Sequence, residues 1–266
     1  MGVIRGFFAV IASILLFLSI FSSVFLLILS SSLNYDNLQK ESKEVIKGIL
    51  EKNMNISSAV DTALPFIQIY CQTNSEYVFN AQGYTFTIPC NITSGGREGI
   101  IDNGVDYLIK GIYYKEYDCE FIDCFSKNEI PTFIFSMKSY VFLNNLFYIF
   151  LFASFLLLVL TFFLIKKKTN VPILVGSLLI ASSFPLFKIS NLINFIPNET
   201  AVKIIGLFFS SAPSISIKVL IAGIILLVAG IILRIFKAGV SISNIFSKFK
   251  KPETKETKKI ANSKSK

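Results

Sequence analysis

The stretch that decides the fold is SYVFLNNLFYIFLFASFLLLVLTFFLI, residues 139–165, because its 27 consecutive residues carry no charge. A helix rises about 1.5 Å per residue, so about 20 apolar residues cross a hydrocarbon core roughly 30 Å thick. Residues 7–29 form a second uncharged run, and residues 219–233 form a third. With 53% hydrophobic residues and a mean hydropathy of +0.62, the chain is more apolar than an ordinary soluble domain. The sequence therefore predicts a polytopic α-helical membrane protein.

Four transmembrane helices are expected, at about residues 7–30, 140–165, 171–189 and 213–236. The third is the least regular of them, because Pro185 should kink or end it. Lys188 and Lys218 lie near helix ends, where a lysine side chain can extend to the membrane surface. The alternative is that one of these lysines lies inside the membrane on a substrate path.

The first apolar run follows Arg5, and a charged start of this kind also occurs in secretory signal peptides. Its 23 uncharged residues exceed the apolar core of about 7–15 residues that signal peptides have. No A-x-A-like cleavage site follows the run clearly. We therefore expect residues 1–30 to be an uncleaved N-terminal transmembrane helix.

Basic residues are distributed unequally among the segments that join these helices. Arg5 precedes the first helix, three lysines at 166–168 join the second to the third, and residues 234–266 hold ten Lys or Arg against two Glu. Basic segments next to transmembrane helices lie preferentially in the cytoplasm. We therefore expect a multi-pass protein of the cell membrane with both termini in the cytoplasm. Residues 31–138 would then be extracytoplasmic, and residues 139–236 would hold the other three transmembrane helices.

The C-terminal tail, residues 237–266, contains too few apolar residues to fold alone, so we expect it to be disordered. Its lysines should attract anionic lipid headgroups of the bilayer. Only Phe246 and Phe249 are interleaved with the basic residues. No nucleic acid is therefore expected as a partner.

Residues 31–138 are acidic, with nine Lys or Arg and fourteen Asp or Glu, a net charge of −5. This length suffices for one small domain with its own core. From Asn34 onward, apolar residues recur at helical spacing between Lys and Glu residues. We expect this amphipathic helix to continue the first transmembrane helix as a stalk.

The rest of this segment mixes helical and strand patterns. A second helix is expected through residues 59–70, with Ser57 or Ser58 as its N-cap. Residues 76–89 alternate in polarity as a β-hairpin does, and residues 98–114 have helical apolar spacing. The prediction is a small, mainly helical α+β domain between the first two transmembrane helices.

All four cysteines, Cys71, Cys90, Cys119 and Cys124, lie in this domain. An even number of cysteines in an extracytoplasmic domain is typical of disulfides. Three pairings are possible, and we favour Cys71–Cys90, which would close the hairpin, with Cys119–Cys124, which would close a short loop. A metal site and a redox motif are the alternatives for DCEFIDCF, residues 118–125. Both are disfavoured, because the chain has no histidine and the spacing is not C-x-x-C.

Three N-x-S/T sequons occur, at Asn55, Asn91 and Asn198. All three fall on the predicted extracytoplasmic side, which makes these asparagines candidate glycosylation sites. About as many sequons would arise by chance in a chain with this many Asn, Ser and Thr residues.

The fourth transmembrane helix contains a repeat of small residues: Ala222 and Gly223 recur seven residues later as Ala229 and Gly230. Small residues at this spacing line one helix face and let two helix backbones approach closely. We expect them to pack helices in a compact four-helix bundle or in a homo-oligomer. A short interfacial helix is expected before it, with Phe208 and Phe209 dipping into the bilayer.

Motifs for nucleophilic, metal or phosphate chemistry are absent from the sequence. Asp102 and Asp106 share one helical face and could act as acid and base, but solvation is the more common role of such a pair. We therefore expect a non-catalytic membrane protein without a cofactor or metal. Its extracytoplasmic domain would bind an unknown protein partner or serve a structural role, alone or as a homo-oligomer. The alternative is an accessory subunit of a transporter, channel or secretion complex; a surface enzyme is a third hypothesis.

Overall fold

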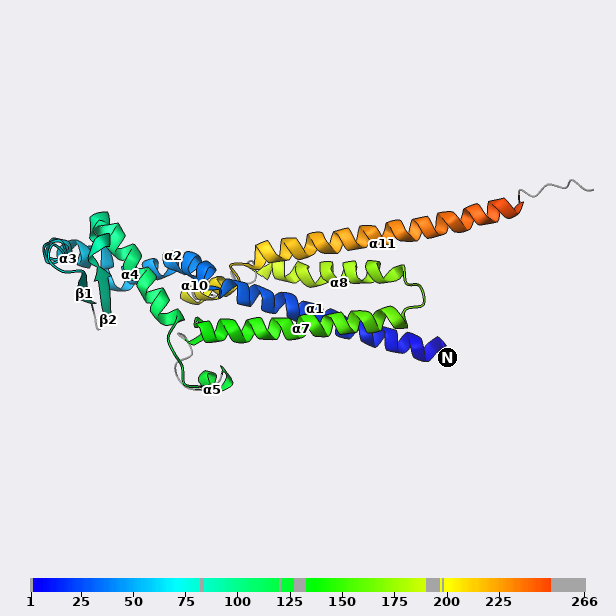
Figure 1. Cartoon of the computed structure of the whole chain (residues 1–266), viewed down its shortest axis with the longest axis horizontal. Coiled ribbons are helices and arrows are strands. Elements are labelled where there is room, and N and C mark those ends of the chain that lie inside the picture. The colour runs from blue at the N-terminus through cyan, green and yellow to red at the C-terminus, as the bar shows by residue number, and fades with distance from the viewer. Residues whose placement is uncertain are drawn as a thin grey trace, which may run out of the picture.

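The computed structural model describes residues 2–81, 84–119, 121–126, 133–189, 197 and 199–249. Four long helices lie side by side, and a group of shorter helices with a β-hairpin lies at one end of them (Figure 1). The long helices are α1 (Gly2–Ser32), α7 (Met137–Leu164), α8 (Asn170–Phe187) and α11 (Ala212–Phe249). All four are long and apolar enough to cross a membrane, which confirms the helices that the uncharged runs predicted.

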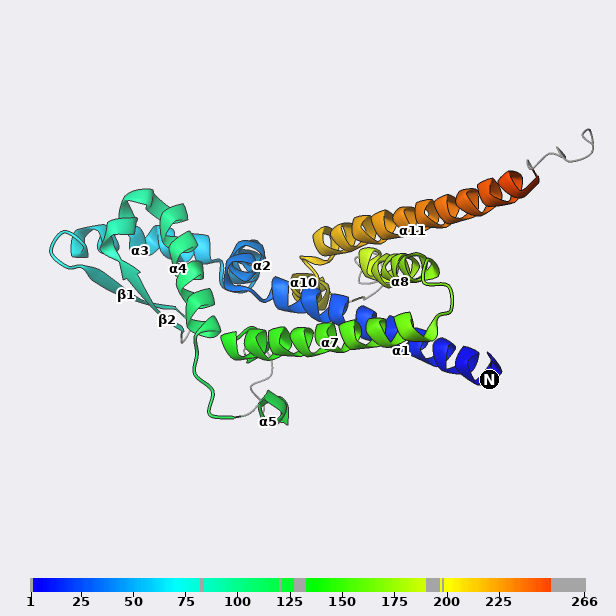
Figure 2. The same cartoon turned by 45° about the vertical axis from the view of Figure 1, so that its right-hand side comes forward.

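Helix α1 lies at the centre of the bundle. It packs along α7 on one side and against α8 on the other, and α8 in turn packs along α11 (Figures 1 and 2). One face of α1 is buried at every fourth residue, which is the spacing that brings side chains onto one side of a helix. The buried core of the bundle consists of Leu16, Ile20, Val24, Ile28, Leu186 and Ala212.

Two polar contacts join α1 to α7. The Ser19 and Ser154 hydroxyl oxygens are 2.9 Å apart in the buried contact. The Arg5 guanidinium donates from Nε to the carbonyl of Leu164 at 2.9 Å and from Nη2 to the carbonyl of Phe163 at 2.7 Å. The last carbonyls of a helix lack partners within the helix and carry its negative dipole end, so a cation is favourable there. Arg5 therefore caps the C-terminal end of α7, a role that its sequence position did not indicate.

Helices α8 and α11 approach each other at glycines. A Cβ atom at Gly176 would lie 2.6 Å from the backbone nitrogen of Leu227 and 2.7 Å from the carbonyl oxygen of Gly223. Gly223 and Gly230 are buried at this contact, whereas Ala222 and Ala229 are exposed. The glycines of the repeat thus pack against α8, and the alanines lie on another face of α11 and do not pack in this bundle.

The predicted continuous stalk is wrong. Helix α1 ends at Ser32, and α2 (Tyr35–Met54) begins after a turn. The backbone of Asn34 is extended, and its side-chain oxygen accepts a hydrogen bond from the Asp36 backbone N–H at 3.2 Å. Asparagine is among the strongest N-cap residues, so the chain starts a new helix here instead of continuing the first. Figure 2 shows α2 turned away from the axis of α1.

Asn55 separates α2 from α3 (Ile56–Tyr70) and has a positive φ of 45°. Asparagine tolerates this left-handed conformation better than most residues. The second helix therefore starts before Ser57, and neither Ser57 nor Ser58 is its N-cap. Instead, the backbone N–H and the hydroxyl of Ser57 donate to the Glu51 carboxylate at 3.1 and 2.9 Å.

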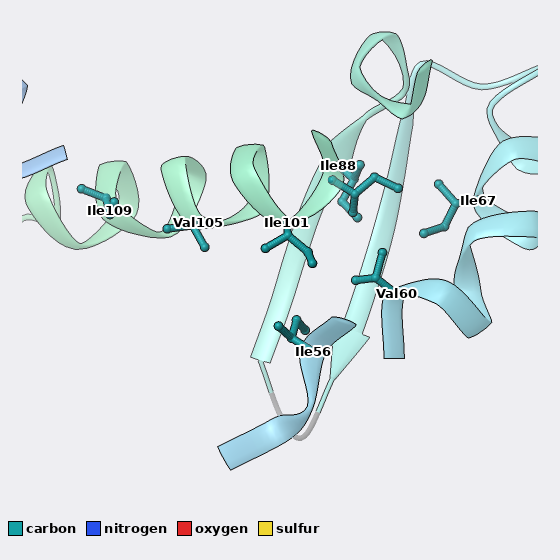
Figure 3. Close-up of a cluster of buried hydrophobic side chains, with 8 residues drawn as sticks. Ile56, Val60, Ile67, Ile88, Ile101, Val105 and Ile109 are labelled. Atoms are coloured by element: carbon teal, nitrogen blue, oxygen red, sulfur yellow. The ribbon is translucent and has the colours of Figure 1, made fainter. Parts of the chain in front are cut away.

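The hairpin and the next helix complete the outer domain, by which we mean residues 35–119 as the structure describes them. Strands β1 (Glu76–Ala81) and β2 (Tyr84–Pro89) pair antiparallel, with Tyr77 opposite Ile88. A 3-10 helix η1 (Cys90–Gly95) leads into α4 (Gly96–Tyr113). Helices α3 and α4 and strand β2 enclose a core of aliphatic side chains (Figure 3): Ile56, Val60, Ile67, Ile88, Ile100, Ile101, Val105 and Ile109.

Three tyrosines join the start of α2 to the end of α4, close to where α1 ends. The ring of Tyr35, at the start of α2, lies 5.2 Å from that of Tyr113 and 5.4 Å from that of Tyr114, at the end of α4. Burial, together with the neighbouring Tyr114, raises the pKa of Tyr113 to about 12. An ordinary tyrosine is already neutral at physiological pH, so the raised pKa means that the Tyr113 phenol resists ionisation into more alkaline solution.

Helix α11 continues to Phe249, so residues 237–249 are helical and not part of a disordered tail as the sequence analysis expected. Extending an existing helix adds one hydrogen bond for each residue ordered, whereas a new helix must first be nucleated. After Pro213, near the start of α11, the next proline in the sequence is Pro252, which lies beyond the last residue of the helix. Residues 250–266 lie outside the described part of the chain.

A helix, α10 (Glu199–Phe208), is present where the interfacial helix was expected, and Phe208 and the following Phe209 contact protein. The ring of Phe208 stacks on Phe135 at 5.0 Å, and that of Phe209 lies 5.9 Å from Phe25 of α1. These contacts hold α10 against the outer end of the bundle. Lys188 and Lys218 are both exposed on the bundle surface.

Candidate functional site

All four cysteines form disulfides. Cys71 at the end of α3 is bonded to Cys90 at the end of β2, and Cys119 is bonded to Cys124 in the short helix α5 (Phe121–Ser126). This is the pairing that the hairpin and the short loop favoured. Because Cys119 and Cys124 are bonded to each other, neither has the thiolate that binds a metal.

The Cys119–Cys124 disulfide lies beside an open groove of about 870 Å³, which we call the outer groove. One wall is the segment that leads from α4 to α5, and the other wall is the first turns of α7. The groove carries aromatic rings and charges of both signs. Its described lining residues are Tyr114, Lys115, Glu116, Tyr117, Asp118, Phe121, Met137, Lys138, Val141, Phe142 and Asn145.

Lys138 holds the two walls together. Its ammonium donates to the backbone carbonyl of Tyr117 at 3.0 Å and also to that of Cys119. The rings of Phe121 and Phe142 stack at 3.9 Å, with an angle of 10° between their planes, and join the walls a second time. A charged hydrogen bond and a ring stack therefore join the two walls of the groove, and the Cys119–Cys124 disulfide constrains the segment beside them.

Two rings of the groove wall pack on a buried ring behind it. Phe133 is fully buried, 5.2 Å from the ring of Tyr117 and 5.4 Å from that of Phe121. The Tyr117 hydroxyl is buried and has no hydrogen-bond partner among the described residues. A buried hydroxyl without a partner costs free energy, so this position lowers the stability of the wall. Lys115 lies over the same ring, 5.1 Å from its centre.

Asp102 and Asp106, the acid–base pair considered from the sequence, bind lysines of α2. Lys43 lies 2.9 Å from Asp106 and 3.6 Å from Asp102, and Lys47 also pairs with Asp102. Burial by itself raises the pKa of Asp102, but the hydrogen bond from Lys47 and the charges of both lysines outweigh it and lower that pKa. The same hydrogen bond raises the pKa of Lys47. These carboxylates therefore join α2 to α4 as ion pairs.

We expect Asp102→Asn to lower the unfolding free energy of the outer domain by about 0.5–1 kcal/mol at pH 7, the range of partly exposed ion pairs. The pKa of Asp102 is lower in the folded chain than its usual value of 3.8. Its contribution is therefore complete above about pH 4 and is lost as the pH falls through the folded pKa. Thermal unfolding of both proteins at pH 7 and pH 3 measures this. Glu41→Gln, at an exposed site on α2, is the control. An equal difference between wild type and Asp102→Asn at both pH values would contradict the ion-pair role.

Two of the three sequon asparagines are exposed in the structure. Asn55 lies in the turn between α2 and α3, and Asn91 lies in η1; Asn198 is outside the described residues. The Thr93 hydroxyl of the second sequon is buried and donates to the carbonyl of Cys90 at 2.8 Å. Ser57 of the first is bonded to Glu51.

The outer groove was not found from the sequence, although the residues beside its disulfide had been singled out. Lys138 is the last charged residue before the uncharged run of residues 139–165, and nothing local indicates that it donates to the carbonyls of Tyr117 and Cys119. The cluster of aromatic residues on both sides of DCEFIDCF was the available signal. Searches for similar proteins do not assign the groove a role: no protein-family description, curated protein or solved structure matches this chain.

Proposed function

We propose that this chain is a non-catalytic, multi-pass protein of the cell membrane whose outer domain binds a partner protein through the outer groove. The charge distribution supports an orientation with both termini in the cytoplasm and residues 31–138 outside. In that orientation the outer groove opens to the extracytoplasmic side, at the level where α7 leaves the membrane. Basic residues after α11 contact anionic lipid headgroups on the other side.

The observation that carries this proposal is the groove itself. It has about 870 Å³ of open volume, and its aromatic walls are joined by the Phe121–Phe142 ring stack and by Lys138. Aromatic side chains provide large contact areas at low entropic cost, which is why they are enriched where proteins bind each other. The net charge of −5 on residues 31–138 favours a basic partner segment. At the groove, Glu116 and Asp118 provide two carboxylates beside Lys115 and Lys138, and Lys138 already donates to the carbonyls of Tyr117 and Cys119.

Charge reversal in the groove tests the proposal. The double variant Glu116→Lys, Asp118→Lys should lose a partner that co-purifies with the wild-type protein from its native membrane, by about tenfold or more in mass-spectrometric abundance. The control is Glu41→Lys with Glu76→Lys, which changes the charge equally at two exposed sites away from the groove. Retention of the partner by the groove variant would contradict this site. Purification of the wild type with its own copies alone would instead favour a structural homo-oligomer.

An open face of the bundle supports the second candidate function, an accessory subunit of a larger membrane complex. A groove of about 620 Å³ lies between α7 and α8 over α1, lined by residues that include Ile20, Tyr148, Phe152 and Val175. A transmembrane helix of a larger complex would fit such an apolar groove by close packing. A photoreactive residue at Phe152 that cross-links to another polypeptide would favour this function; cross-links to lipid alone would count against it.

A further inference from the structure

A separate cavity of about 200 Å³ lies where the outer domain meets α10. Its walls come from α2, from the end of α4, from Phe135 and from α10. Ser42 is the polar residue of the lining, and its hydroxyl donates to the carbonyl of Leu38 in its own helix. The other described lining residues are aliphatic or aromatic, so the cavity offers a ligand apolar contacts without a free polar group.

The chemistry of the walls selects an apolar occupant. Water needs two or more polar partners to remain in a cavity, and an engineered apolar cavity of about 150 Å³ stays dry and binds small hydrocarbons. Val45, Ile49 and Ile112 face this cavity but are only partly buried, and Ile204 is 36% exposed. A hydrocarbon in the cavity would remove these side chains from water, which is favourable in proportion to the area covered.

The cavity is already formed in the protein without a ligand. Phe135 forms part of one wall, and its ring stacks on Phe208 of α10 at 5.0 Å with 26° between the planes. This stack fixes α10 relative to the segment that enters α7. A preformed apolar site loses little conformational entropy when it is occupied.

Position identifies the source of the hydrocarbon. Phe135 lies two residues before α7 begins at Met137, and α10 ends at Phe208, four residues before α11 begins at Ala212. Figures 1 and 2 both place α10 beside the turn from α1 to α2, at the outer end of the bundle. If the long helices cross a bilayer, this end lies at its surface, and the nearest apolar chains belong to its lipids.

We propose that the cavity binds an acyl chain of a phospholipid from the adjacent leaflet, with the chain end turned out of the bilayer toward α2 and α4. The inference rests on the part of the proposed function in which the four helices cross a membrane. It does not depend on the outer groove, which shares no described lining residue with this cavity. An acyl chain held in this way would tie the outer domain to the membrane surface.

The absence of tryptophan from the chain allows a direct test. The variant Phe135→Trp places a single fluorophore in the cavity wall, and the protein is reconstituted in phosphatidylcholine vesicles whose acyl chains carry bromine. We expect bromine at the chain terminus to quench this tryptophan at least about twofold more than bromine near the headgroup. A tryptophan that merely lies at the membrane surface would show the opposite order. Stronger quenching by bromine near the headgroup than by bromine at the chain terminus, or no quenching by either lipid, would overturn the proposal.

Filling the cavity provides the matched comparison. In the Phe135→Trp protein, Ile49→Phe or Val45→Phe should remove the extra quenching by terminal bromine. Ile69→Phe makes the same change on the exposed side of α3 and should leave it unchanged. Persistence of the quenching in both filled variants, with native-like thermal unfolding, would show that the chain does not occupy this cavity. The reporter Phe66→Trp, exposed on α3, should not be quenched if the outer domain stands clear of the bilayer.

Discussion

Gly176→Leu should separate α8 from α11 and lower the unfolding free energy of the bundle by more than about 3 kcal/mol. The added Cβ alone would lie 2.6 Å from the backbone nitrogen of Leu227, 2.7 Å from the carbonyl oxygen of Gly223 and 2.9 Å from the Cα of Leu227. All three atoms belong to the backbone of α11, so no side-chain rotation can make room. The thermal unfolding midpoint in one detergent, with the yield of monodisperse protein, measures the loss.

The other two glycines of this contact should give smaller losses in a fixed order. At Gly230 a Cβ would meet the Ile173 side chain at 2.6 Å and the Ile173 backbone nitrogen at 2.8 Å. At Gly223 the nearest atoms are no closer than 3.0 Å. Alanine substitutions should therefore destabilise the bundle most at Gly176, less at Gly230 and least at Gly223. The exposed Ala229→Leu is the control, and destabilisation by it equal to that of Gly176→Leu would contradict the contact.

Loss of the Cys71–Cys90 disulfide should be the next most damaging change, at about 3 kcal/mol for the double serine variant. The bond spans 19 residues and joins the end of α3 to the end of β2. Ile67 and Ile88, which lie four and two residues from the bonded cysteines, are both fully or nearly fully buried in the core of the outer domain. The hairpin should therefore detach from the core, and limited proteolysis should cut within residues 76–89.

The matched control is the double serine variant at Cys119 and Cys124. This bond spans five residues and lies outside the core of α3, α4 and β2. Its loss should loosen the wall of the outer groove while the hairpin remains resistant to protease. Equal protection of the hairpin in both variants would contradict the role assigned to Cys71–Cys90.

The long helices were predictable because apolar length is a local property. The structure has apolar helices at Ile4–Ser32, Met137–Leu164, Asn170–Phe187 and Ala212–Lys237, within a few residues of those expected. The error at the end of α1 was also local. Asn34 was counted as the start of an amphipathic pattern, but the competing signal, its strong preference for an N-cap, decided the conformation.

Contacts between distant segments could not be read in the same way. The repeat in α11 indicated a close approach, but a sequence pattern on one helix does not say whether Gly223 or Ala222 faces the neighbour. Gly176 was not singled out, because its importance arises from Leu227, 51 residues later. Lys138 and Arg5 each donate to backbone carbonyls of residues distant in the sequence. Every residue has a backbone carbonyl, so the sequence does not show which ones accept these bonds.

The bond from Arg5 to the carbonyl of Leu164 joins residues 159 positions apart, which bears on the order in which the molecule is assembled. Chains are synthesised from the N-terminus, and domains generally fold as they emerge. Helix α1 is therefore made first but has no α7 to pair with until every residue of the outer domain has been made. Both disulfides join residues that are complete before that moment. We expect the outer domain to fold on a helix that is still unpaired, with the closure of α1 on α7 as a late step of biogenesis.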